Sequence, residues 1–196
     1  MENKLGINYQ QAQELLNDNI QDNIIKMHMV ETEAIMRALA SRFNENEDEW
    51  GTIGLLHDID WEKTKNNPSQ HCVKAVDILK EAGASEYLIN SIISHAYANE
   101  FIPEYKNKFR ETKLEYCLVA AETLTGLIIA SALVQPDKKL ASVQIKSLKK
   151  KFKQKSFAAN CNRDIIMECE KAGINIDDFL TIGLKALQNI SSKLGL

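Results

Sequence analysis

Apolar residues recur at spacings of three and four along nearly the whole chain, and runs in which β-branched and polar residues alternate are missing. The first pattern is that of one face of an α-helix, and the second is that of a half-buried strand. The chain is therefore predicted to be all-α, a helical bundle. Helices are predicted over residues 8–19, 22–43, 47–57, 69–82, 85–98, 111–134, 142–154, 163–172 and 177–194.

Residues that begin or end helices support several of these boundaries. Pro68-Ser69 predicts a cap before the helix at 69–82, Gly83 follows its last turn, and Ser85 caps the next helix. A break is predicted near Pro136, where the charge balance also changes. We expect one helical domain over residues 1–135 and a C-terminal helical extension over residues 136–196 packed on it.

Composition narrows the class of protein. With 44% hydrophobic and 26% charged residues among 196, the chain has the make-up of an ordinary globular protein. The N-terminus shows no secretory signal, so a cytoplasmic location is expected. The most apolar stretch, from Cys117 to Val134, carries Glu122 and two threonines, which favours a buried helix over a membrane span. The four cysteines have no metal-binding or disulfide spacing and are interpreted as reduced thiols.

The four histidines carry the first chemical signal, because each can be placed on the apolar stripe of a predicted helix. They are His28, His57, His71 and His95. A buried imidazole without a partner costs about 1–3 kcal/mol, so each must find a hydrogen bond or a metal. A backbone carbonyl explains any one of them, whereas four together ask for a common explanation.

Two acidic residues sharpen this picture. Glu122 is surrounded by apolar neighbours, so it must pair with a distant basic residue, bind a metal or stay protonated. His57 and Asp58 follow the apolar run Ile53-Gly54-Leu55-Leu56. Neighbouring residues on a helix point about 100° apart, so this pair reaches one centre only if the helix ends there.

The order His28, His57-Asp58, His71, His95 and a late carboxylate resembles the HD-domain superfamily of metal-dependent phosphohydrolases. The string GLLHDID is similar to the GLLHDIG-type motif of that family, and the resemblance spans about residues 22–130. Beyond it, AAETLTGLIIASALVQP and SLKKKFKQKSFAANCNRDII look like a bacterial HDIG-type subgroup. Three positions depart from the family pattern: Glu122 replaces the usual aspartate, Asp60 a glycine and Trp61 a frequent lysine.

The resemblance implies a role for each matching residue. His28, His57, Asp58 and Glu122 would form a first metal site, and His71 and His95 would complete a second, with Asp58 bridging. His57 and Asp58 would stand at the catalytic centre. One or two divalent ions are implied as cofactor, and the donor set suits manganese, iron, zinc or magnesium. A bound ion would activate water for attack on phosphorus.

The implied function is therefore a phosphomonoesterase or phosphodiesterase on a nucleotide-like or other small phosphorylated substrate. Two alternatives remain open. One is a di-iron oxygenase of the HD type, which bound iron and oxygen uptake would identify. The other is a binding or regulatory module that kept the helical scaffold and lost its chemistry, which absence of metal would favour.

A basic stretch in the extension adds one expectation about substrate. No acidic residue lies between Lys138 and Arg163, and lysines there share one face of the helix predicted at 142–154. A lysine run is most often a solvated surface. The functional interpretation is that Lys149 and Lys153 rim the site and attract the phosphorylated substrate. Nucleic-acid binding is the weaker interpretation, because aromatic residues are sparse there.

Overall fold

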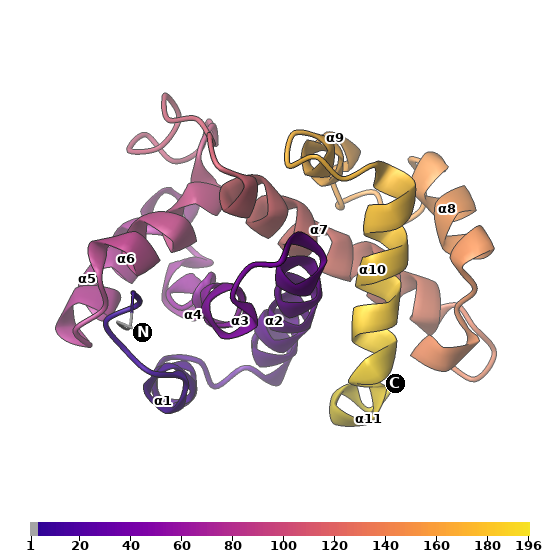
Figure 1. Ribbon diagram of the computed structural model, residues 1–196, viewed down its shortest axis with the longest axis horizontal. Helices are drawn as coiled ribbons and strands as arrows, with labels where there is room; N and C mark the ends of the chain where they lie inside the picture. The colour runs from indigo at the N-terminus through magenta and orange to yellow at the C-terminus, as the bar shows by residue number, and fades with distance from the viewer. Residues whose placement is uncertain (1–3) are drawn as a thin grey trace.

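The computed structural model describes residues 4–196, and every regular element in this range is a helix, which confirms the all-α prediction (Figure 1). The α-helices are α1 (Tyr9–Asn19), α2 (Asn23–Phe43), α3 (Glu47–Leu56), α4 (Trp61–Thr64), α5 (Val73–Glu81), α6 (Glu86–Ile93), α7 (Lys113–Leu133), α8 (Ile145–Lys153), α9 (Arg163–Ile166), α10 (Ile176–Asn189) and α11 (Ser191–Leu194). The 3-10 helices are η1 (Pro68–Gln70), η2 (Ser94–Ala96), η3 (Leu140–Ser142) and η4 (Met167–Glu170).

Side-chain caps begin several helices where the sequence places them. Ser85 accepts a hydrogen bond from the Leu88 N–H and caps α6, as predicted. Thr112 and Glu115 form a capping box at the start of α7, in which each side chain bonds the backbone of the other residue. These bonds satisfy backbone donors that the first helical turn leaves unpaired.

The helix predicted at 69–82 begins later than expected. Pro68 starts the 3-10 helix η1, and α5 begins only at Val73. Between them His71 is extended and Cys72 adopts a left-handed conformation with φ 64°. A left-handed residue cannot continue a right-handed helix, so α5 cannot extend back to Ser69. The predicted cap is wrong: Ser69 lies inside η1, and neither η1 nor α5 begins with a side-chain cap. The break places His71 outside any helix.

Helices α2, α3 and α7 pack together at the centre of the molecule (Figure 1). Gly54 of α3 allows this packing, because a Cβ there would lie 3.0 Å from both the Met36 side chain and the Thr32 carbonyl of α2. Helix α10 covers α2 and α7 from the other side. Gly183 of α10 meets α7 closely, since a Cβ there would lie 2.5 Å from a methyl group of Leu124.

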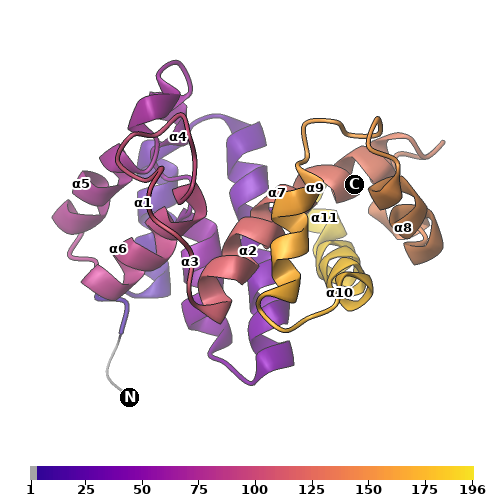
Figure 2. The same cartoon turned by 90° about the horizontal axis from the view of Figure 1, so that it is seen from above.

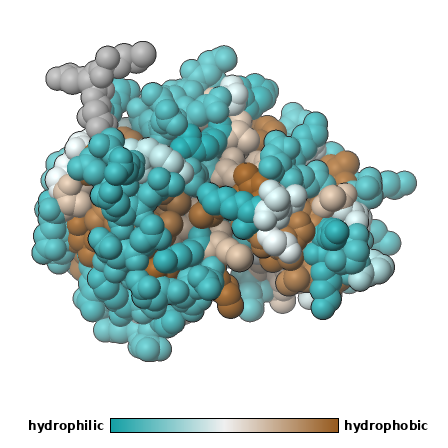
Figure 3. All heavy atoms as spheres, turned by 90° about the horizontal axis from the view of Figure 1, so that it is seen from below, coloured by the Kyte–Doolittle hydropathy of each residue, from teal (hydrophilic) through white to brown (hydrophobic). Residues whose placement is uncertain are grey.

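The C-terminal helices α8, α10 and α11 gather at one end of the molecule, and α5 and α6 lie at the opposite end (Figures 1 and 2). The segment after Gln135 thus packs on α2 through α10, and on α7 through α8, α9, α10, η3 and η4. Its division from residues 1–135 as a separate domain stays a prediction. The face shown in Figure 3 is largely hydrophilic, with smaller hydrophobic patches between the polar side chains.

Helix α7 is the one helix of residues 4–196 that is long and apolar enough to cross a membrane by length and composition. However, 61% of its apolar 18-residue window is buried inside the protein. Burial of this kind is typical of a central core helix. It agrees with the interpretation of the apolar stretch as a buried helix.

Candidate metal centre

Four separate parts of the chain bring the histidines together. His28 lies on α2, His57 follows the last residue of α3, His71 precedes α5, and His95 lies in η2. Nε2 of His28 lies 3.1 Å from Nε2 of His57, and Nε2 of His71 lies 3.0 Å from Nε2 of His95. The imidazoles therefore meet in two pairs, each joined through the Nε2 edges.

Asp58 lies between the two pairs. Its Oδ1 is 3.6 Å from Nε2 of His57, 3.4 Å from Nε2 of His71 and 3.5 Å from Nε2 of His95. Its Oδ2 is 3.8 Å from Nε2 of His28. Helix α3 ends at Leu56, and the following turn lets His57 and Asp58 face the same centre. One carboxylate thus contacts both pairs of histidines.

The outer ring nitrogens of two histidines bond to backbone carbonyls. Nδ1 of His57 lies 2.9 Å from the Gly54 oxygen, and Nδ1 of His95 lies 2.7 Å from the Ile92 oxygen. A carbonyl oxygen only accepts, so each Nδ1 carries the hydrogen when the ring is neutral. Nε2 of each ring is then a free lone pair that points at the centre.

The other two histidines are fixed by side chains. Nδ1 of His28 lies 3.0 Å from Oγ1 of Thr125, and that hydroxyl donates to the Glu122 carbonyl oxygen at 2.7 Å, so it accepts from His28. Nδ1 of His71 lies 3.0 Å from Oδ1 of Asp60, which also accepts. All four neutral rings therefore direct an Nε2 lone pair inward.

This arrangement fits divalent cations. Facing lone pairs 3.0–3.1 Å apart repel unless a proton or a cation lies between them. Two ligand atoms on one ion at about 2.1 Å lie about 3.0–3.4 Å apart, close to the distances found here. We call His28, His57 and Asp58 the first ligand group and His71, His95 and Asp58 the second ligand group.

Protonation in the absence of a cation follows the same geometry. Burial lowers the pKa of His57 to about 3, so that ring stays neutral. Burial also opposes charge on His71, but its hydrogen bond to Asp60 raises its pKa to about 10. Burial favours the neutral form of Asp58, yet the surrounding imidazoles hold its pKa well below its usual range. The centre thus joins a carboxylate to imidazoles whose inner nitrogens a proton or a cation can occupy.

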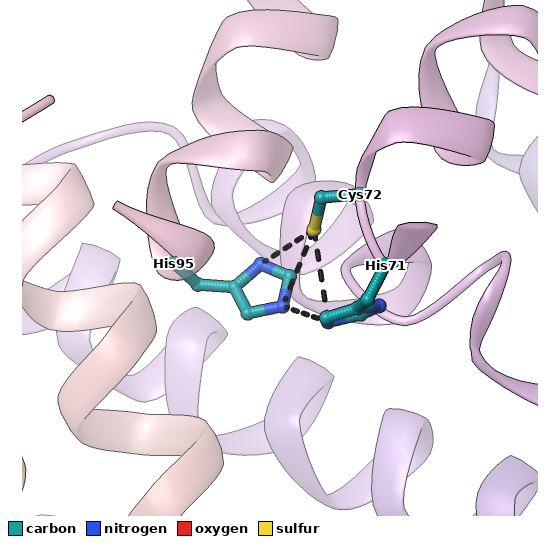
Figure 4. A group of neighbouring side chains, drawn as sticks. All are labelled: His71, Cys72 and His95. Carbon is teal, nitrogen blue, oxygen red and sulfur yellow. Dashed lines mark hydrogen bonds between the residues drawn. The ribbon is translucent and has the colours of Figure 1, made fainter. Parts of the chain in front are cut away.

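Cys72 borders the second ligand group and was not predicted there (Figure 4). Its Sγ lies 3.7 Å from Nε2 of both His71 and His95, and 3.8 Å from Nδ1 of His95. Nearly equal distances to the two nitrogens of His95 mean that the sulfur is off the Nε2 lone-pair axis. Its adjacency to His71 was the one sequence signal that pointed to this position.

Glu122 lies on α7 beside the centre, and its role as a ligand stays a prediction. Its Oε1 accepts a hydrogen bond from the Thr123 hydroxyl at 2.5 Å, and burial raises its pKa. Among residues 4–196, the compact groups of candidate ligand atoms include His28, His57 and Asp58 but not Glu122. Glu122 and His28 both line the adjoining cavity.

The cavity next to the first ligand group has a volume of about 570 Å³. Its polar walls include Asn99, Asn160 and Asn162, and Trp61 contributes an aromatic side chain. The extension therefore reaches the site through the segment around Asn160. Lys149 and Lys153 are not among the residues lining this cavity, and Lys149 pairs with Asp177 at 3.2 Å. Their role in attracting substrate stays a prediction.

Comparison with known protein families gives one match. The family model described as HD domain matches residues 26–131, which is more than half of the chain and includes all six predicted metal-site residues. The match is to the domain family and specifies no subgroup. No curated protein and no solved structure matches the chain.

Proposed function

The chain belongs to the HD-domain family, a family of generally metal-dependent hydrolases, and on this basis we propose that it is a phosphohydrolase acting on a nucleotide-like or other small phosphorylated substrate. One observation carries the proposal. Four buried or half-buried histidines turn their Nε2 atoms toward a single carboxylate, Asp58, while hydrogen bonds engage their Nδ1 atoms on the outer side. Divalent cations would account for this convergence, because they would take the place of the proton that the raised pKa of His71 keeps on that ring when no cation is bound.

The protein residues have separate tasks in this reaction. Asp58, which faces both histidine pairs, would be a ligand shared by the two ligand groups. Bound divalent ions would supply acidification of a water molecule and neutralisation of phosphoryl charge. The outer hydrogen bonds of the histidines fix their tautomers before substrate arrives, which removes a reorganisation cost.

The cavity explains how substrate would approach. Its amide and hydroxyl groups offer hydrogen bonds to the part of the substrate beyond the phosphate, and Trp61 offers a flat apolar surface. Glu122 borders the same space, where it would repel additional negative charge. We therefore place the phosphate at the ligand groups and the leaving group in the cavity.

The test begins with metal content. Protein purified without chelator should contain up to two divalent ions per chain, and it should release phosphate from at least one member of a panel of phosphate esters. Removal of the metal with a chelator should abolish turnover, and adding back manganese, iron, zinc or magnesium in turn should identify the active ion. Protein without bound metal would support the binding-module alternative, and iron-loaded protein that consumes oxygen would support the oxygenase.

A further inference from the structure

Asp60 is a fully buried carboxylate next to the ligand groups, at the position where the similar family motif has glycine. Its Oδ1 accepts from Nδ1 of His71 at 3.0 Å, and its Oδ2 accepts from the Ala75 N–H at 3.1 Å. An unpaired buried charge costs several kcal/mol, so these two bonds account for its presence. Asp60 thereby connects the His71 ring to the first turn of α5.

The outer partner of His71 differs in kind from those of the other three histidines. His57 and His95 donate to backbone carbonyls, and His28 donates to the Thr125 hydroxyl. Only His71 donates to a carboxylate. A charged acceptor makes an imidazole a stronger metal ligand than a neutral acceptor does, and it fixes the ring more firmly.

The position of His71 in the chain makes this support necessary. Extended His71 and left-handed Cys72 lie between η1 and α5, so no regular helix fixes the His71 ring. Trp61 packs edge-on against that ring with 4.9 Å between the centroids, and Asp60 holds its Nδ1. Asp60 and Trp61 are consecutive, so one short turn limits the ring on two sides.

We propose that Asp60 is a positioning residue that makes the second ligand group bind divalent cations more tightly than the first, so that the centre loads its two ions in a fixed order. The inference rests on the proposed metal centre and adds that its two ligand groups differ in their affinity for cations. Both groups share Asp58, so the first cation to bind interacts most strongly with the negative charge of this carboxylate. The stronger imidazole of His71 decides that competition.

The experiment is a zinc titration of the metal-free full-length protein in competition with a chromophoric chelator. The wild type should bind zinc in two resolved steps. Asp60→Asn, which removes the charge at nearly constant size, should weaken the tight step by about 10–100-fold and leave the weak step nearly unchanged. Thr125→Val is the matched variant at His28, and it should weaken only the weak step.

Two further variants assign the steps without altering Asp60. His28→Ala should keep the tight step, and His95→Ala should remove it. Ser85→Ala is the stability control, because it deletes the cap of α6 outside both ligand groups and should lower the melting temperature with both zinc steps intact. Cobalt absorption spectra provide a second readout of the environment at each group.

Several outcomes would overturn the inference. It fails if Asp60→Asn leaves the tight step unchanged or weakens both steps equally, and it fails if the tight step survives in His95→Ala. Should Asp60→Asn not fold, the His28→Ala and His95→Ala titrations still decide the order of loading. A wild type that binds no zinc, cobalt or other divalent ion would instead refute the metal centre itself, and with it the proposed function.

Discussion

At the scale of single residues, Asp58 has the most demanding position. It faces the Nε2 atoms of all four histidines at 3.4–3.8 Å. We predict that Asp58→Ala abolishes metal binding and phosphate release, while the helical fold is kept, because this carboxylate serves the ions more than the core. Elemental analysis, phosphate release and circular dichroism measure the three effects. Substantial turnover in this variant would contradict the mechanism.

Glu31 allows a prediction that is independent of the metal centre. It is 6% exposed on α2, and burial raises its pKa from 4.5 to about 7. The pKa of Glu31 is therefore higher in the folded protein than in the unfolded chain. Its contribution to the free energy of unfolding is fully present below pH 4.5 and is lost as the pH rises through 7. Glu31→Gln should therefore stabilise the protein at pH 8 by up to about 3 kcal/mol and change little at pH 4.5.

The measurement for Glu31→Gln is urea unfolding of the variant and the wild type at several pH values. Only the difference between the two proteins is used, because the other titrating groups then cancel. A difference that does not depend on pH would show that Glu31 is solvated in the native state.

The histidines and Asp58 were predictable from the sequence, whereas their partners were not. His28 lies on an α-helix, where the spacing of its apolar neighbours predicts an inward face, whereas His57, His71 and His95 lie beyond the ends of α-helices and were indicated by the family pattern. The partner of His28 is Thr125, which lies 97 positions away, and local spacing holds no record of that contact. Asp60 was noticed as a departure from a motif, but its bonds to His71 and Ala75 appear only in the folded chain.

At the scale of elements, one arginine organises the wall of the cavity. Arg163, at the start of α9, donates to five backbone carbonyls of the preceding segment: those of Lys151, Phe152, Phe157, Ala158 and Cys161. That segment leads into Asn160 and Asn162, which line the cavity. A lysine has a single side-chain nitrogen, so it cannot donate to all five carbonyls as the planar guanidinium group does.

We predict that Arg163→Lys raises KM for the phosphate substrate about tenfold or more and changes kcat little, because hydrogen bonds to charged groups contribute about 1.5–3 kcal/mol each to holding this wall. Steady-state kinetics measure both constants. Arg37→Lys is the control, since Arg37 pairs with Glu33 and Asp48 away from the cavity. Equal increases of KM in both variants would show a general loss of stability instead.

The helices followed closely from apolar spacing, and the exceptions have local causes. Helix α4 has four residues, which is too short to show a helical period. The helix predicted at 85–98 divides into α6 and η2, so His95 lies in a 3-10 turn. The helix predicted at 69–82 is interrupted by the left-handed Cys72, a conformation that cysteine seldom adopts.

At the scale of the whole molecule, α10 joins the C-terminal extension to the central helices at Gly183. A Cβ there would lie 2.5 Å from a Leu124 methyl group of α7. Gly183→Ala should therefore destabilise the protein by about 1–3 kcal/mol, despite the better helix propensity of alanine, because the core must shift to admit the methyl group. Chemical denaturation measures this change, and Thr181→Ala on the same helix should alter stability much less.

The arrangement of the extension was only partly predictable. The change of charge balance near Pro136 predicts where it begins, and that boundary stays a prediction. Which helix it would cover depended on the fit of α10 against α2 and α7, and no periodicity within either segment encodes that fit. The position of the segment around Asn160 at the cavity likewise depends on packing between parts of the chain that are far apart in the sequence.

The contact between α7 and α10 also bears on how the chain is made. Ribosomes add residues in order, so α7 (Lys113–Leu133) is complete well before α10 (Ile176–Asn189) emerges to cover it. At about 5–20 residues per second, the long apolar helix α7 waits several seconds before α10 can cover it. Stalled or prematurely terminated translation beyond Leu133 would release nascent chains with this helix exposed, and such chains become substrates for chaperones and proteases.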